Sequence, residues 1–136
     1  MIVKKLHIRH WTVLFLFCFD ARNSEDIEDA LIWADAPNSI IESVMNTVFA
    51  ERPNEGFCYS APSIRRSVVA IGRTSSGPEF LNTTIHEIMH LSQHIAAEDG
   101  IEPLSEEIAY LIGDITRDVS HIVCELSCPH CNSQRD

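Results

Sequence analysis

Hydrophobic residues form one continuous run near the start of the chain, at residues 11–19. Its aromatic and β-branched composition favours a strand buried on both faces. Lys4, Lys5 and Arg9 precede the run, as in a secretory signal peptide, but Asp20 ends it and no small-residue cleavage site follows. Nine residues are also too few to span a bilayer as a helix. We therefore expect a strand rather than a leader.

The hydrophobic pattern after residue 20 changes to helical spacing and back. One helix is expected to begin at Asn23 or Ser24, and a second at Asn38 or Ser39, after Pro37 interrupts the first. The remaining expected elements are short strands at 57–60 and 67–72 and long helices at about 80–97 and 104–124. This order predicts an α+β fold, with a small sheet and its helices first and two long antiparallel helices last.

Composition places limits on the kind of protein. A chain of 136 residues forms a single domain, here expected to cover 1–136. Its net charge of −10 makes nucleic acid a poor partner, because such binding depends on Lys and Arg. The five cysteines are an odd number, which favours a reducing compartment. We expect a cytoplasmic protein without a membrane or nucleic-acid partner.

His86, Glu87 and His90 form an H-E-x-x-H motif in the first long helix. Residues four apart lie on the same helix face, so both imidazoles can reach one zinc ion. Glu87 can then take a proton from a water whose pKa zinc lowers from about 15.7 toward 7. The histidines lie off the expected apolar face, which consists of Ile85, Ile88, Met89, Ile95 and Ala96. The motif therefore predicts two metal ligands and a general base.

A catalytic zinc also needs a third protein ligand and an open fourth position. The last helix begins with Glu106 and Glu107, and the connection before it contains Pro103, so the helix can fold back against the first one. Helical geometry mildly prefers Glu107, which lies nearer to the apolar stripe of its helix. A carboxylate that is not a ligand would still stabilise the helix N-terminus.

The spacing His86-Glu-x-x-His90 followed by Glu106-x-x-Ala-Tyr110 resembles that of gluzincin-type zincin metallopeptidases. More narrowly, it resembles small peptidases of bacteriophages and mobile elements. The resemblance covers about residues 67–120 and implies a zincin-like fold in which the two long helices carry the metal site.

The same resemblance implies roles for individual residues. Glu87 would be the general base and Glu107 only a neighbour of the site. Residues 67–72 would form the strand beside the cleft, which pairs with extended substrate. The implied zinc ligands are His86, His90 and Glu106. This assignment conflicts with the geometric preference for Glu107, and we follow the motif.

The chain departs from the family pattern in two places. Larger gluzincins have an Asp four residues after the ligand Glu, whereas Tyr110 stands there, and Asp114 is a candidate to orient an imidazole instead. His94 extends the motif, as in phage-type repressor-cleaving metalloprotease regulators, and we expect it at the surface or supporting the ligands. Tyr110 either stabilises an oxyanion or packs between the helices.

A second cluster of soft ligands lies at the C-terminus and consists of His121, Cys124, Cys128 and Cys131. Such a set suits a structural zinc, and a disulfide between Cys128 and Cys131 or a free reactive end are the alternatives.

The sequence thus predicts a zinc-dependent peptidase that acts on a peptide or protein. The alternatives are a non-catalytic zinc-binding accessory or interaction protein and a repressor-cleaving regulator.

Overall fold

The structure, a computed structural model, describes residues 1–127. This part of the chain has an α+β fold, with one mixed sheet of four strands and four α-helices. The elements are β1 (Ile2–Ile8), β2 (Trp11–Phe19), α1 (Ser24–Trp33), α2 (Asn38–Ala50), β3 (Gly56–Ala61), β4 (Arg66–Gly72), α3 (Gly77–Asp99) and α4 (Glu106–Ser127). Short 3-10 turns at Ala21–Asn23 and Pro62–Ile64 precede α1 and β4.

Strand β1 is the element that the sequence did not predict. It pairs with β2 through a hairpin whose two turn residues, Arg9 and His10, have φ angles of 48° and 66°. Two-residue hairpins of this kind usually carry Asn-Gly, so the usual turn signal is absent. Lys4 and Lys5, which resemble the start of a leader, therefore belong to a strand. Within residues 1–127, every helix is too short or too polar to span a bilayer.

The order of strands in the sheet is β1-β2-β4-β3. Strands β2 and β4 are parallel, whereas the two outer pairs are antiparallel. Strand β4 therefore lies in the interior and β3 at an edge, so the expectation that residues 67–72 form the strand beside the cleft was wrong. The uninterrupted apolar run from Val68 to Ile71 is itself typical of a strand buried on both faces.

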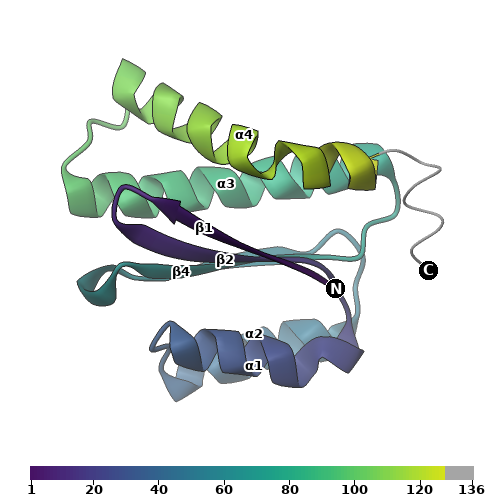
Figure 1. The fold of residues 1–136 in the computed structure, drawn as a ribbon. Coiled ribbons are helices and arrows are strands. Elements are labelled where there is room, and N and C mark those ends of the chain that lie inside the picture. The colour runs from purple at the N-terminus through teal and green to yellow at the C-terminus, as the bar shows by residue number, and fades with distance from the viewer. Residues whose placement is uncertain (128–136) are drawn as a thin grey trace.

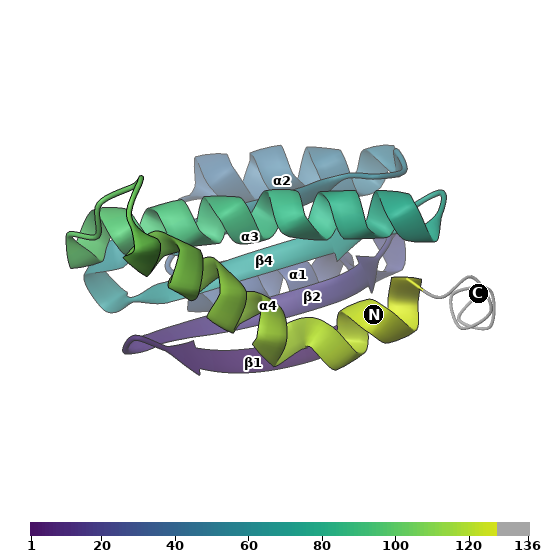
Figure 2. The same cartoon turned by 90° about the horizontal axis from the view of Figure 1, so that it is seen from above.

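Helices cover both faces of the sheet (Figure 1). Helices α1 and α2 pack on one face, and the long antiparallel pair α3 and α4 packs on the other. Helix α3 contacts β3 and β4, while α4 contacts β1 (Figure 2). Two apolar clusters result, one on each side of β2, which confirms that residues 11–19 form a strand buried on both faces.

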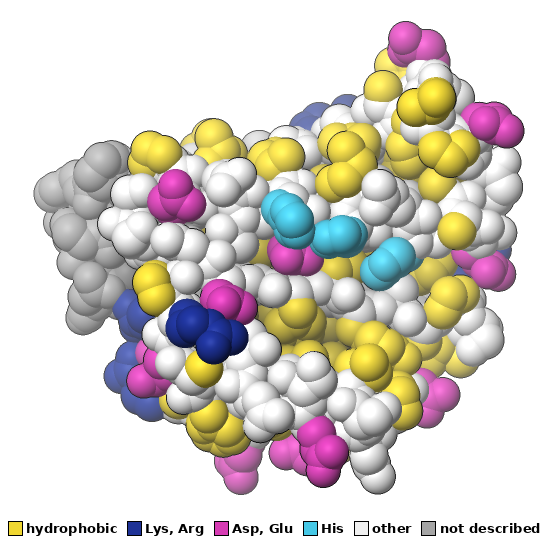
Figure 3. Space-filling view, turned by 180° about the vertical axis from the view of Figure 1, so that it is seen from behind, with side chains coloured by type: hydrophobic (Ala, Val, Ile, Leu, Met, Phe, Trp, Pro, Cys, Tyr) yellow, Lys and Arg dark blue, Asp and Glu magenta, His cyan; other side chains and the backbone are white. Residues whose placement is uncertain are grey.

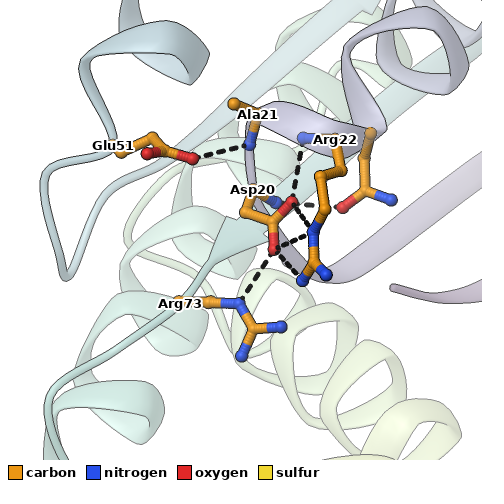
Figure 4. Close-up of polar contacts among 6 residues, drawn as sticks. Asp20, Ala21, Arg22, Glu51 and Arg73 are labelled. Carbon is orange, nitrogen blue, oxygen red and sulfur yellow. Dashed lines mark hydrogen bonds and ion pairs between the residues drawn. The ribbon is translucent and has the colours of Figure 1, made fainter. Parts of the chain in front are cut away.

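The corner between β2 and α1 is tied to the end of β4 by Asp20 (Figure 4). Its carboxylate accepts hydrogen bonds from the Arg22 backbone N–H at 2.9 Å and from Nε of Arg73 at 3.1 Å. Hydrogen bonding by Arg22, above all through its side chain, keeps the pKa of Asp20 well below its usual range, with a smaller contribution from Arg73. This network holds together the C-terminal ends of the two parallel strands, β2 and β4.

Candidate metal centre

Helix α3 turns one side toward the sheet and the side with the histidines toward solvent. Ser76 starts the helix, because its Oγ accepts a hydrogen bond from the Glu79 N–H at 3.2 Å. The apolar residues buried beneath the helix include Ile88, Leu91, Ile95 and Ala96. His86 and His90 are exposed, as the motif predicts. Ile85 and Met89, expected on the apolar face, are instead 41% and 43% exposed, because they lie to one side of the buried stripe.

The two motif histidines approach each other closely. Their Nε2 atoms are 3.1 Å apart, and the rings meet edge to face with centroids 4.7 Å apart. Two imidazoles that bind one zinc at 2.0–2.1 Å with a tetrahedral angle have nitrogens about 3.3 Å apart. The pair therefore fits a shared zinc ion with little movement. The same distance also fits an N–H···N hydrogen bond between neutral rings.

Glu87 lies buried below this pair, with 5% of its surface exposed. It packs over the start of β3, where a Cβ added to Gly56 would lie 3.2 Å from Glu87 Cγ. Burial raises the pKa of Glu87, and the nearby His86 and His90 partly oppose this effect. Among the described residues, none donates a hydrogen bond to its carboxylate. The group is therefore a shielded carboxylate beside two potential ligands, as a general base requires.

The structure does not bring Glu106 to the histidines. Within residues 1–127, no group of three or more His, Cys, Asp or Glu side chains is arranged to hold a metal. Helix α4 begins at the far end of α3, and His90 lies nine residues before the last residue of α3, about 14 Å along its axis. Glu106 is exposed there, and Glu107 binds Arg9 at 2.7 Å. The third-ligand assignment therefore stays a prediction.

Apart from His94, the other predicted site residues that the structure describes lie on α4 and not on α3. Tyr110 is 69% exposed, so packing between the helices was wrong for this side chain. Asp114 forms an ion pair with Arg117 at 3.2 Å. His121 and Cys124 are exposed on α4. Cys128 and Cys131 lie outside the described residues, so the second zinc site remains a prediction.

His94 has partners that the sequence analysis missed. Its Nδ1 lies 2.7 Å from Ser60 Oγ and 3.7 Å from Cys58 Sγ, both on β3. Ser60 Oγ in turn lies 2.7 Å from the Oγ of buried Ser67 on β4. Burial raises the pKa of Cys58 to about 12, and Glu87 adds to this effect. Side chains alternate along a strand, so the sequence could have predicted that Cys58 and Ser60 lie on the same face of β3.

A hollow of about 280 Å³ lies where β2 and β4 end, with Phe19 and Val48 in its lining. Its charged side chains already pair with one another: Arg73 with Asp20, and Arg52 with Glu55 at 2.9 Å. Among the described residues that line it, the hollow therefore lacks a group of polar side chains without ion pairs, such as His86, Glu87 and His90 form on α3.

The face of the molecule with α3 and β3 is shown in Figure 3. Histidine side chains lie in a row across it, with an acidic side chain beside them and an apolar, hollowed area below. Comparisons of the chain with protein-family models, curated proteins and solved structures found no match. The case for a function therefore rests on the site itself.

Proposed function

We propose that this protein is a zinc-dependent peptidase with its metal centre on α3. The observation that carries the proposal is the pair of exposed imidazole nitrogens, 3.1 Å apart, with the buried Glu87 close enough to interact with both rings electrostatically. The resemblance of the motif to gluzincin-type peptidases points to the same chemistry. Both lines of support come from the same motif, because the one-turn spacing of His86 and His90 is what brings their nitrogens together.

The residues of the chain have distinct tasks in this proposal. Zinc, when bound, would act as a Lewis acid and lower the pKa of water. His86 and His90 would hold the ion through Nε2. The Glu87 carboxylate would accept the proton of the attacking water, and its raised pKa suits a base that must later release that proton to the leaving amine.

The position of β3 explains why a peptide is the proposed substrate. Strand β3 is the edge of the sheet next to α3, and in the described part of the chain its outer side pairs with no strand. An extended peptide can add to such an edge through main-chain hydrogen bonds. A peptide held there would pass beside the histidine pair.

One observation favours a second candidate, a non-catalytic zinc-binding accessory protein. Only two ligands converge in the described residues, whereas catalytic zinc sites have three protein ligands. Such a protein would keep the metal for binding or stability and would not need Glu87.

The substitution Glu87→Gln separates the two candidates. In a peptidase, it should reduce cleavage of a quenched fluorescent peptide library by at least about 100-fold, the scale of general-base catalysis, while zinc binding stays intact. Glu98→Gln is the matched control, because Glu98 is an exposed carboxylate on the same helix. Unchanged cleavage by the Glu87 variant, or no cleavage by the zinc-loaded parent protein, would contradict the proposal.

A further inference from the structure

A chain of hydrogen bonds links the sheet to His94, one turn beyond the metal pair. It runs from Ser67 Oγ on β4 through Ser60 Oγ on β3 to His94 Nδ1, with both steps at 2.7 Å. Ser67 is fully buried, and Ser60 and His94 are half-buried. The chain fixes the orientation of an imidazole beside the proposed cleft.

The hydroxyl hydrogens of Ser60 and Ser67 and the ring hydrogen of His94 determine which group donates at each of these hydrogen bonds. If Nδ1 carried a proton, Ser60 Oγ would accept from both Nδ1–H and the Ser67 hydroxyl, and its own hydrogen would turn to Cys58 Sγ, a weak acceptor. In the opposite direction, Ser67 donates to Ser60 and Ser60 donates to Nδ1, so each hydroxyl hydrogen has an oxygen or nitrogen acceptor. The second direction is therefore favoured.

The surroundings of His94 agree with this direction. Cys58 keeps its proton at neutral pH, because its pKa is raised to about 12, and its Sγ lies 3.7 Å from the same Nδ1. Burial, with a contribution from His90, lowers the pKa of His94, which favours the neutral ring. The neutral ring then carries its hydrogen on Nε2, for which the described residues provide no partner.

We propose that His94 binds substrate by donating a hydrogen bond from Nε2 to a main-chain carbonyl oxygen of the peptide held along β3. This inference rests on the proposed function and gives the site a residue that positions the peptide. The spacing supports it. The zinc that His86 and His90 would share lies about midway between them, so His94 is about 9 Å further along the helix axis. An extended peptide covers that distance in two to three residues, so His94 would contact the peptide two or three residues from the bond that is cleaved.

The direction of the Ser67–Ser60–His94 hydrogen bonds can be measured from the protonation of the two His94 ring nitrogens, without metal or substrate. Long-range 1H–15N spectra of the 15N-labelled, metal-free protein should show His94 with a bare Nδ1 and a protonated Nε2. Ser67→Ala should weaken this preference, whereas Cys58→Ala, which alters a neighbour outside the chain, should preserve it. A proton on Nδ1 in the parent protein would overturn the assignment.

The binding role predicts a particular kinetic pattern. The probe is the best-cleaved member of a quenched fluorescent peptide library, used with zinc-loaded protein. His94→Phe should raise KM by about 2- to 10-fold, the value of one hydrogen bond, and change kcat less than about twofold. His94→Gln should restore KM, because its amide nitrogen reaches close to the Nε2 position.

The outcomes distinguish this inference from the function on which it rests. An active parent protein with unchanged KM in His94→Phe, or a Gln variant that behaves like Phe, would overturn the role of His94 alone. If the parent protein cleaves no peptide, the proposed function fails and this role falls with it.

Discussion

Gly56, at the start of β3, lies so close to its neighbours that a side chain at this position would clash with them. A Cβ there would lie 2.7 Å from the Ala70 carbonyl oxygen and 3.2 Å from Cγ of Glu87. Gly56→Ala should therefore reduce the free energy of unfolding by about 1–3 kcal/mol, as overpacking does, and displace Glu87. Urea unfolding measures the first effect.

Gly113 on α4 offers the matched control for this change. No atom lies within 4 Å of a Cβ built there. Gly113→Ala should raise the free energy of unfolding by about 0.5–1 kcal/mol, because alanine stabilises a helix interior relative to glycine. Equal stability of Gly56→Ala and the parent protein would show that the close approach of Gly56 to Ala70 and Glu87 is not present in solution.

Asp20 shows how a single carboxylate makes stability depend on pH. Its hydrogen bonds with Arg22 and Arg73 lower its pKa in the folded protein, so the carboxylate stabilises the fold above its unfolded pKa of about 3.9. This contribution is lost as the pH falls below 3.9 toward the lowered value. Asp20→Asn keeps a capping side chain and removes the charge, so it should destabilise by at most about 1 kcal/mol at pH 7.

The pH dependence of this variant is the test. The difference in unfolding free energy between the parent protein and Asp20→Asn should be constant from pH 5 to 8 and shrink below about pH 4. A difference that grows in acid would contradict the assigned pKa shift.

At the level of single residues, the sequence predicts what is local. The positions of His86 and His90 on one exposed helix face follow from helical spacing and are seen in the structure. The burial of Glu87 depends on Gly56, which is distant in sequence, and the partners of His94 come from β3 and β4. Those contacts depend on tertiary packing, which no local pattern specifies.

At the level of elements, the start of α4 decides whether Glu106 takes part in the site. An exposed ion pair between Arg9 and Glu107, 39% and 53% exposed, holds this turn near the β1–β2 hairpin and contributes little stability. On the observed geometry, Glu106→Gln should leave zinc affinity unchanged. Loss of a true ligand should lower it by at least about tenfold, since even residues that only orient a ligand reach that value.

Zinc titration of Glu106→Gln, with Glu107→Gln as the neighbouring control, distinguishes the geometry from the motif. A large loss for Glu106→Gln alone would mean that the end of α3 and the start of α4 rearrange when zinc binds. That result would support the gluzincin assignment against the observed arrangement.

Most elements could be predicted from hydrophobic periodicity, and the exceptions have physical causes. Strand β1 was missed because Arg9 and His10 form a tight turn without the usual Asn or Gly. The strand beside the cleft was assigned to residues 67–72, which form the interior strand β4, because pairing order is a property of the whole sheet and not of one strand. The long helices were predicted within a few residues at their ends.

At the scale of the molecule, the two helical layers have different consequences. Helices α1 and α2 bury one face of the sheet. On the other face, α3 packs next to the edge strand β3 and keeps the side with the histidines exposed. The α+β class and the antiparallel pair could be predicted from the sequence. The proximity of the histidine row to a free strand edge could not, because it depends on β3 lying outside β4.

The central claim is that His86 and His90 bind one zinc ion together. Calorimetric zinc titration tests it most directly, in protein carrying Cys128→Ser and Cys131→Ser so that the C-terminal cysteines do not contribute. We expect one site whose affinity falls by at least about tenfold in His86→Ala and in His90→Ala, and stays unchanged in His7→Ala, a control histidine on β1. Zinc binding of parental strength in the His86→Ala, His90→Ala double variant would contradict the account.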